Sequence, residues 1–85
     1  SNTKSDVLNE QSNSLYNWIL KTKHLVKGKI KLTHILQSSP KTINARSKFK
    51  ALRLMEQMVE NGQAKVSAYN DSDSAIEWTI NPIGL

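Results

Sequence analysis

The chain has 85 residues, a formal charge of +5 at pH 7 and no cysteine. A chain of this length forms one small domain with little core to spare for a deep catalytic cleft, and the lack of cysteine excludes disulfides, thiolate metal sites and cysteine nucleophiles. No apolar run approaches the roughly 18 residues of a membrane span and no signal-peptide pattern is present, so we expect a soluble, cytoplasmic protein without a membrane partner.

Charge is segregated along the chain. Ten of the twelve Lys and Arg residues lie between positions 11 and 55, and all seven Asp and Glu residues lie outside that segment, which therefore carries +10. A solvated face normally mixes signs because like charges repel. A one-signed block indicates a polyanionic partner, of which nucleic acid is the commonest for a basic domain. A solvated face or a protein-docking surface is the alternative.

The N-terminal residues read as a linker. Residues 1–13 are polar, rich in Ser and Asn, and have no sustained apolar period, so we expect a flexible segment before a domain at 14–85. Ser1-Asn2 resembles the remnant of a cleaved affinity tag, and together with the missing initiator Met this indicates a fragment of a longer protein.

Two helices are expected before the middle of the chain. Leu15, Trp18 and Ile19 repeat at the helical spacing, which predicts a helix near residues 13–23. Gly28 and Ile30 then suit a loop and one short strand. A second short helix is predicted near 31–37, and the cluster Ser38-Ser39-Pro40 ends it because proline disfavours the helical conformation of the residue before it.

The longest predicted helix runs over residues 42–61, with Gly62 as a left-handed C-terminal cap. At 100° per residue, one side gathers Ala45, Phe49, Leu52, Met55 and Val59, and the opposite side gathers Arg46, Ser47, Lys50, Arg53 and Gln57. Leu54 and Met58 fall outside the apolar stripe, and we expect them to pack under a neighbouring element rather than to form a dimer contact.

After Gly62 the hydrophobic period becomes two, which predicts a β-hairpin with strands near 63–69 and 75–80 and a polar turn between them. A lone hairpin is marginal in water, so its apolar face must cover the helices. The expected core then consists of Leu15, Trp18, Ile19, Ile30, Leu32, Ile35, Leu36, Phe49, Leu52, Met55, Val59, Val66, Ile76 and Trp78.

This order of elements predicts an α+β domain that resembles the winged helix-turn-helix superfamily. The resemblance is carried by Leu15-Tyr16-Asn17-Trp18-Ile19-Leu20, by Ile30 to Leu36, and by the leucine-rich helix that closes on Glu60-Asn61-Gly62 before a strand. This ending is similar to winged-helix modules at the C-termini of phage and plasmid primase–helicase-like replication proteins. The resemblance implies a DNA-binding module from a larger replication or transcription protein of a bacterium, phage or plasmid.

In the superfamily, the third helix enters the major groove of double-stranded DNA. The resemblance therefore implies that the side chains which read base edges are Asn44, Arg46, Ser47 and Lys50. Phosphate contacts are implied for Lys41, Thr42 and Lys48. Arg53 lies on the same basic side, and Lys29 and Lys31 beside the first strand extend the positive surface.

The hairpin departs from the superfamily pattern. Its tip carries Asp71 and Asp73, and Glu77 follows on the next strand. Carboxylates would be repelled by a row of phosphates, so we expect the hairpin to stay off the DNA. A protein partner that binds the acidic hairpin remains the second hypothesis.

The sequence predicts no enzyme, no cofactor and no metal site. His24 and His34 are ten residues apart, in a loop and on a short helix, without the spacing or the nearby ligands that metal binding needs. Glycine-rich phosphate loops are lacking as well.

Overall fold

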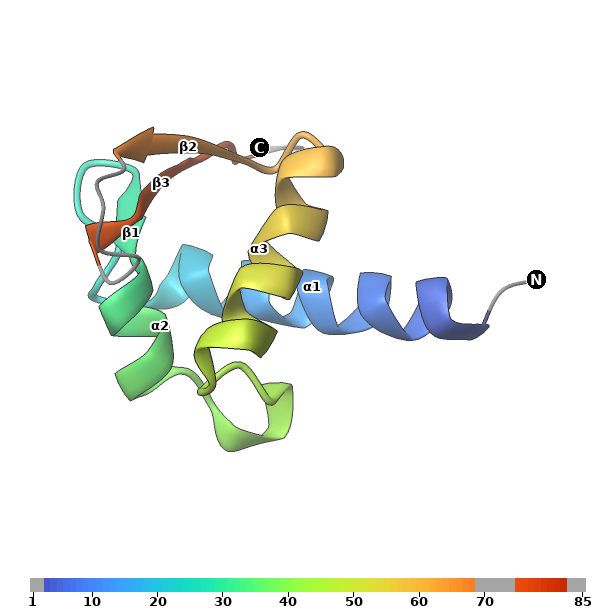
Figure 1. The fold of residues 1–85 in the computed structure, drawn as a ribbon. Helices are drawn as coiled ribbons and strands as arrows, with labels where there is room; N and C mark the ends of the chain where they lie inside the picture. The colour runs from blue at the N-terminus through green and yellow to red at the C-terminus, as the bar shows by residue number, and fades with distance from the viewer. Residues whose placement is uncertain (1–2, 69–74, 83–85) are drawn as a thin grey trace.

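Figure 1 shows the computed structural model of the chain, which describes residues 3–68 and 75–82. Within these residues the fold is α+β, as expected, with three α-helices, one short 3-10 helix and three strands. They follow in the order α1 (Thr3–Lys21), β1 (Lys29–Lys31), α2 (Leu32–Ser38), η1 (Lys41–Ile43), α3 (Lys48–Glu60), β2 (Ala64–Ala68) and β3 (Glu77–Ile80). None of the helices in the described part combines the length and the apolar character needed to cross a bilayer.

The three strands form one antiparallel sheet with β3 in the centre, in the order β1-β3-β2. Trp78 on β3 lies opposite Ile30 on β1 and opposite Val66 on β2. The expected pairing of β2 with β3 is therefore confirmed, whereas the pairing of β1 with β3, about 50 residues later, was not predicted. The polar turn at 70–74 lies outside the described residues.

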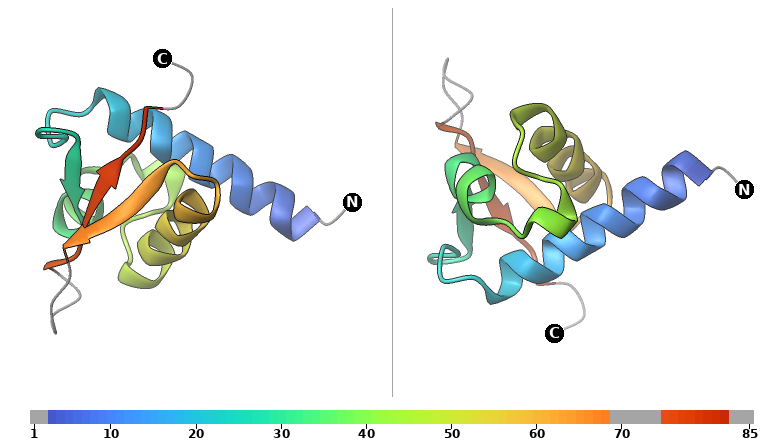
Figure 2. Two further views of the ribbon diagram at one scale, coloured as in Figure 1. Left: turned by 90° about the horizontal axis from the view of Figure 1, so that it is seen from above. Right: turned by 90° about the horizontal axis from the view of Figure 1, so that it is seen from below.

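The helices lie on one side of the sheet, as the views in Figures 1 and 2 agree. The core fills the space between these two layers. Its completely buried members include Leu15 and Ile19 of α1, Ile35 of α2 and Met55 of α3, and Trp78 of β3 is only 3% exposed. Large apolar side chains from every layer meet here, which fixes the sheet and α3 relative to each other.

The first helix starts ten residues earlier than predicted, because α1 begins at Thr3 and includes most of the expected linker. The apolar period could not predict this early start, because the added turns are held by polar contacts. Asn9 Oδ1 and Asn13 Oδ1 accept hydrogen bonds from Asn61 and Gln63, and the fully buried Ser12 donates from Oγ to the Leu54 carbonyl oxygen at 3.2 Å. The N-terminal turns of α1 project beyond the rest of the molecule (Figure 2).

The third helix starts later than predicted, at Lys48 rather than near residue 42. Residues 41–43 form the η1 turn, and Asn44 ends it with a positive φ of 61°. Ser47 caps α3, since its Oγ accepts a hydrogen bond from the Lys50 backbone N–H. This hydroxyl satisfies an N–H that would otherwise lack a partner at the start of a helix, so the helix begins after Ser47.

The predicted apolar stripe of α3 is confirmed only in part: Met55 is buried, but the buried side of the helix is turned away from Phe49 and Val59. Phe49 is 75% exposed and Val59 39% exposed, and Val66 of β2 is 48% exposed. Three further residues of the predicted core are only half-buried, namely Trp18, Leu36 and Leu52. The buried side of α3 carries Met55, as predicted, together with Ala51, Leu54 and Met58.

Packing against α1 explains this rotation of α3. Ser12 of α1 contacts the Leu54 backbone, so the side of α3 that carries Leu54 and Met58 turns toward α1 and the core. The expectation that these two residues pack under a neighbouring element is confirmed.

The end of α3 follows the predicted pattern. Gly62 has a φ of +76°, its N–H bonds to the Val59 carbonyl, and the N–H of Gln63 bonds to the Met58 carbonyl. These two bonds form a Schellman motif, in which glycine adopts the left-handed conformation at little steric cost. The chain then turns directly into β2.

Candidate nucleic-acid interface

The structure divides the predicted contact residues between two parts of the surface. Lys29 and Lys31 flank Ile30 on β1, and both are exposed. The other eight lie on η1, on the turn before α3 and on the first half of α3, and all are exposed. We call them the α3 entry surface, which consists of Lys41, Thr42, Asn44, Arg46, Ser47, Lys48, Lys50 and Arg53.

Three residues predicted to read bases lie before α3 and have local structural roles. Asn44 adopts a left-handed conformation, which asparagine tolerates better than most residues. Arg46 Nε donates to the Ser39 carbonyl oxygen at 2.7 Å, which ties the turn to the end of α2. Ser47 is the N-cap. Arg46 and Lys50 therefore do not lie one turn apart on the same helix, contrary to the sequence prediction.

The cations on α3 itself lie in its first two turns. Lys48 and Lys50 precede Arg53, whose Nη1 lies 3.7 Å from Oε1 of Glu56 on the next turn. Both partners of this ion pair are largely exposed, so it contributes little stability. Glu56 and Glu60 make the second half of the helix acidic, which confines the positive surface of α3 to its N-terminal half.

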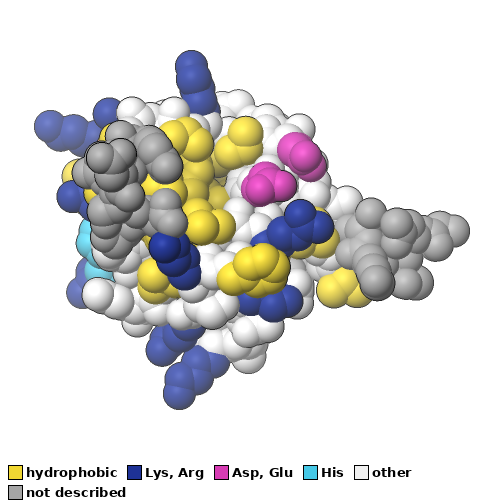
Figure 3. Space-filling model, viewed as in Figure 1, with side chains coloured by type: hydrophobic (Ala, Val, Ile, Leu, Met, Phe, Trp, Pro, Cys, Tyr) yellow, Lys and Arg dark blue, Asp and Glu magenta, His cyan; other side chains and the backbone are white. Residues whose placement is uncertain are grey.

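An apolar strip, missed by the sequence analysis, runs beside these cations. We define it as Phe49, Leu52, Val59 and Val66, together with the edges of Ile76 and Trp78. A groove of about 360 Å³ lies between α3 and the sheet, and a second hollow of about 410 Å³ is lined by Phe49, Leu52, Arg53 and Glu56. Figure 3 shows hydrophobic surface (yellow) between basic and acidic side chains on this face. The sequence analysis placed these residues in the core because their spacing fits a buried stripe as well as it fits an exposed one.

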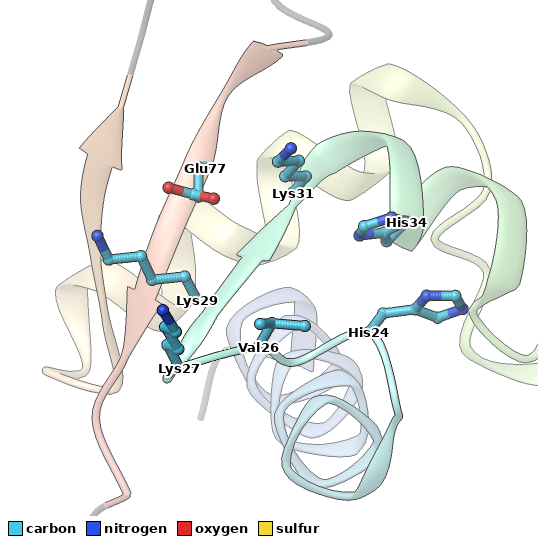
Figure 4. Close-up of a pocket in the computed structure, with 7 residues that line it drawn as sticks. All are labelled: His24, Val26, Lys27, Lys29, Lys31, His34 and Glu77. Atoms are coloured by element: carbon cyan, nitrogen blue, oxygen red, sulfur yellow. The ribbon is translucent and has the colours of Figure 1, made fainter.

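Lys29 and Lys31 contribute to a separate hollow of about 420 Å³, here called the strand pocket. It is lined by His24, Val26, Lys27, Lys29, Lys31, His34 and Glu77. Figure 4 shows the two imidazoles at one end of the pocket and Lys27 and Lys29 at the other. Lys31 and Glu77 are direct partners across β1 and β3, so this carboxylate opposes one of the ammonium groups.

The fold brings the two histidines together. The rings of His24 and His34 stack with their centroids 4.6 Å apart and an angle of 19° between their planes. Burial lowers the pKa of His34 below its usual 6.5, and the nearby positive charges of His24 and Lys31 lower it further. His34 is therefore neutral at pH 7. No local pattern predicts this pair, because the loop and the helix meet only in the tertiary structure.

Comparison with protein-family models, curated proteins and solved structures finds no match for this chain. Among residues 3–68 and 75–82, no three His, Cys, Asp or Glu side chains are grouped so that they could hold a metal ion. Function is therefore inferred from the geometry of the α3 entry surface, the apolar strip and the strand pocket.

Proposed function

We propose that this chain is a winged helix-turn-helix module that binds nucleic acid, with double-stranded DNA as its partner and a role in DNA replication or transcription. The order of helices and strands, with β1 on one edge of the sheet and the β2–β3 hairpin on the other, is compatible with that fold. The observation that carries the functional proposal is the concentration of exposed cations on the α3 entry surface.

The α3 entry surface has two properties that favour binding to a phosphate backbone, namely its positive charge and its position on a helix that is held in the core. Lys41, Arg46, Lys48, Lys50 and Arg53 are all exposed, and the segment from residue 11 to 55 contains no carboxylate side chain. The opposite side of α3 is held in the core by Leu54, Met55 and Met58, so the exposed side is presented on a rigid element. A rigid, one-signed surface at the start of a helix attracts phosphates at small entropic cost.

The contact is expected to involve only the first half of α3. Lys50 lies on the helix and can reach a base edge, whereas Arg46 precedes the helix and is better placed for the backbone. Glu56 and Glu60 would face phosphates with like charge if the whole helix lay in the groove. The helix should therefore approach DNA with its N-terminus, as recognition helices of helix-turn-helix proteins do.

Fluorescence anisotropy with a labelled random duplex of about 20 base pairs tests the proposal. If about five phosphates are contacted, log affinity should fall with log salt at a slope of roughly −4 to −5. The double variant Lys48→Gln/Lys50→Gln should weaken binding and make the slope shallower by about 2. The matched control, Lys21→Gln/Lys65→Gln, loses the same charge outside the α3 entry surface and should bind much more tightly than that variant.

A second candidate function is a protein-docking module, and the apolar strip favours it. Val59 of α3 and Val66 of β2 line the groove and are exposed, and Phe49 is exposed in the second hollow, a feature of protein interfaces more than of DNA-binding helices. Under this hypothesis the duplex gives no anisotropy change at low or physiological salt. Equal binding by both double variants would also argue against the α3 entry surface as the DNA contact.

A further inference from the structure

The strand pocket concentrates positive charge apart from the α3 entry surface. Lys27, Lys29 and Lys31 line it together with a single carboxylate, Glu77, so the pocket carries about +2 when the imidazoles are neutral. The three ammonium groups come from two adjacent parts of the chain, a tight turn and β1. The hollow between them is large enough to admit a small anion together with water.

The turn that presents Lys27 is conformationally unfavourable for lysine. Val26 and Lys29 exchange two backbone hydrogen bonds of 2.9 and 3.0 Å, with Lys27 and Gly28 between them. Their φ angles are +54° and +77°, the combination found in type I′ hairpin turns, whose first central position favours asparagine, aspartate or glycine. A lysine in the left-handed conformation costs about 1 to 2 kcal/mol. The cost is understandable if the ammonium group has a function in the pocket.

The imidazoles add hydrogen-bond donors and a titratable charge. His24 and His34 stack at one end of the pocket, and each ring can donate through a protonated nitrogen. His34 Nδ1 is buried and has no hydrogen-bond partner among the described residues. An anion beside the rings would favour the protonated form of His34 and would offset its repulsion from His24 and Lys31.

We propose that the strand pocket binds a phosphate monoester dianion, held by Lys27, Lys29 and Lys31 and by the imidazoles of His24 and His34. The charge of such a group, close to −2 at neutral pH, matches the charge of the pocket, whereas a phosphodiester carries only −1. The dianion can come from a small phosphorylated molecule or from the 5′-phosphate at the end of a nucleic-acid strand. This site is distinct from the proposed duplex contact and does not depend on it.

Titration with inorganic phosphate, followed by NMR on the ring resonances of His24 and His34 at constant ionic strength, tests the site directly. Saturable shifts are expected, and Lys29→Gln or Lys31→Gln should each weaken binding about two- to fivefold, the effect of one partly exposed charge. Lys65→Gln, on the far edge strand, is the control and should bind like the parent chain. Shifts that stay linear, or that are equal in all variants, would reflect ionic screening and overturn the proposal.

Lys27→Asn distinguishes a role of Lys27 in phosphate binding from a role in the turn, because asparagine favours this turn conformation and lacks the positive charge. This variant should melt at a higher temperature than the parent chain and yet bind phosphate about two- to fivefold more weakly. A purely structural role for Lys27 predicts the gain in stability without the loss of binding. That result would remove Lys27 from the site.

Sulfate isolates the part played by the imidazoles, since it stays doubly charged throughout the working range while phosphate does not. The charged and titratable groups that line the pocket with His34 are His24, Lys27, Lys29, Lys31 and Glu77. Burial, His24 and Lys31 lower the pKa of His34, so a fall in pH through that pKa adds a positive charge to the pocket. Sulfate should therefore bind more tightly at the lower pH, and His34→Gln should reduce this dependence. Equal affinity at both ends of the range would exclude the imidazoles.

Two short thymidine oligonucleotides, with a 5′-phosphate or a 5′-hydroxyl, identify the source of the dianion. Tighter binding of the phosphorylated strand, lost in Lys29→Gln, would assign the pocket to a nucleic-acid end. Equal binding of both strands, together with saturable inorganic phosphate, would assign it to a small phosphorylated molecule. Duplex affinity measured on the Lys48→Gln/Lys50→Gln variant tests the proposed function independently, so either idea can fail alone.

Discussion

The orientation of α3 can be tested by truncating one residue on each of its sides. Leu54 is 1% exposed and packs beside Met55 and Met58, so Leu54→Ala removes three buried carbon atoms and leaves a cavity. Such substitutions lower the free energy of unfolding by about 2 to 5 kcal/mol. Phe49 is 75% exposed, so only about a quarter of its surface is buried and Phe49→Ala loses that small part alone. Full burial of phenylalanine contributes about 1.5 to 3 kcal/mol, and the expected loss is therefore below about 1 kcal/mol.

Urea denaturation followed by circular dichroism distinguishes the two variants. The midpoint of Leu54→Ala should fall steeply at an unchanged slope, while that of Phe49→Ala should stay close to the parent value. Leu54→Met, which keeps the volume, is the control and should cost less than about 1.5 kcal/mol. If Phe49→Ala lost about 3 kcal/mol or more, the apolar strip would be core and the orientation of α3 described above would be wrong.

Four further outcomes are expected. Ser47→Ala should lower the free energy of unfolding by about 0.5 to 2 kcal/mol through loss of the cap, and Ser47→Asp should retain most of it in the same thermal-denaturation assay. Gly62→Ala should cost about 1 to 2 kcal/mol in chemical denaturation, because its φ is +76° and an added Cβ meets no atom within 4 Å, which leaves backbone strain as the cause. Since the pKa of His34 is lower in the folded chain than its usual 6.5, stability should be full above that pH and decline as the pH falls through it, and His34→Gln should flatten the profile of melting temperature against pH. Asp71→Lys/Asp73→Lys, at positions outside the described residues, should strengthen non-specific duplex binding and steepen its salt dependence.

Local sequence signals predicted the elements but not the rotation of α3. Gly62, the stop at Ser39-Pro40 and the alternation in β3 each fix a boundary through a local rule, and these boundaries are confirmed. In α3, the apolar residues from Leu54 to Leu52 span an arc of about 160° at 100° per residue, and Phe49 lies outside it. Such an arc is wider than the side that the core covers, and contact with α1 selects the part that contains Leu54 and Met58.

Other features could not be predicted because they depend on contacts between distant residues. The early start of α1 rests on Asn9, Ser12 and Asn13, polar residues that look like a linker until their partners are known. The stacking of His24 on His34 needs the loop to pack against α2. Of the predicted contact residues, the exposure of the ten side chains could be anticipated, but their division between the α3 entry surface and the strand pocket could not.

The central position of β3 has a consequence for how the chain folds. β3 comes last in the sequence, yet β1 and β2 each pair with it and not with each other. Neither edge strand can complete its hydrogen bonds until residues 77–80 arrive. The β2–β3 pairing is a local hairpin, whereas β1 must wait for a partner about 50 residues later in the chain, a contact of high sequence separation that forms slowly. A chain interrupted before residue 75 would expose two unpaired strands at once, a state that favours aggregation.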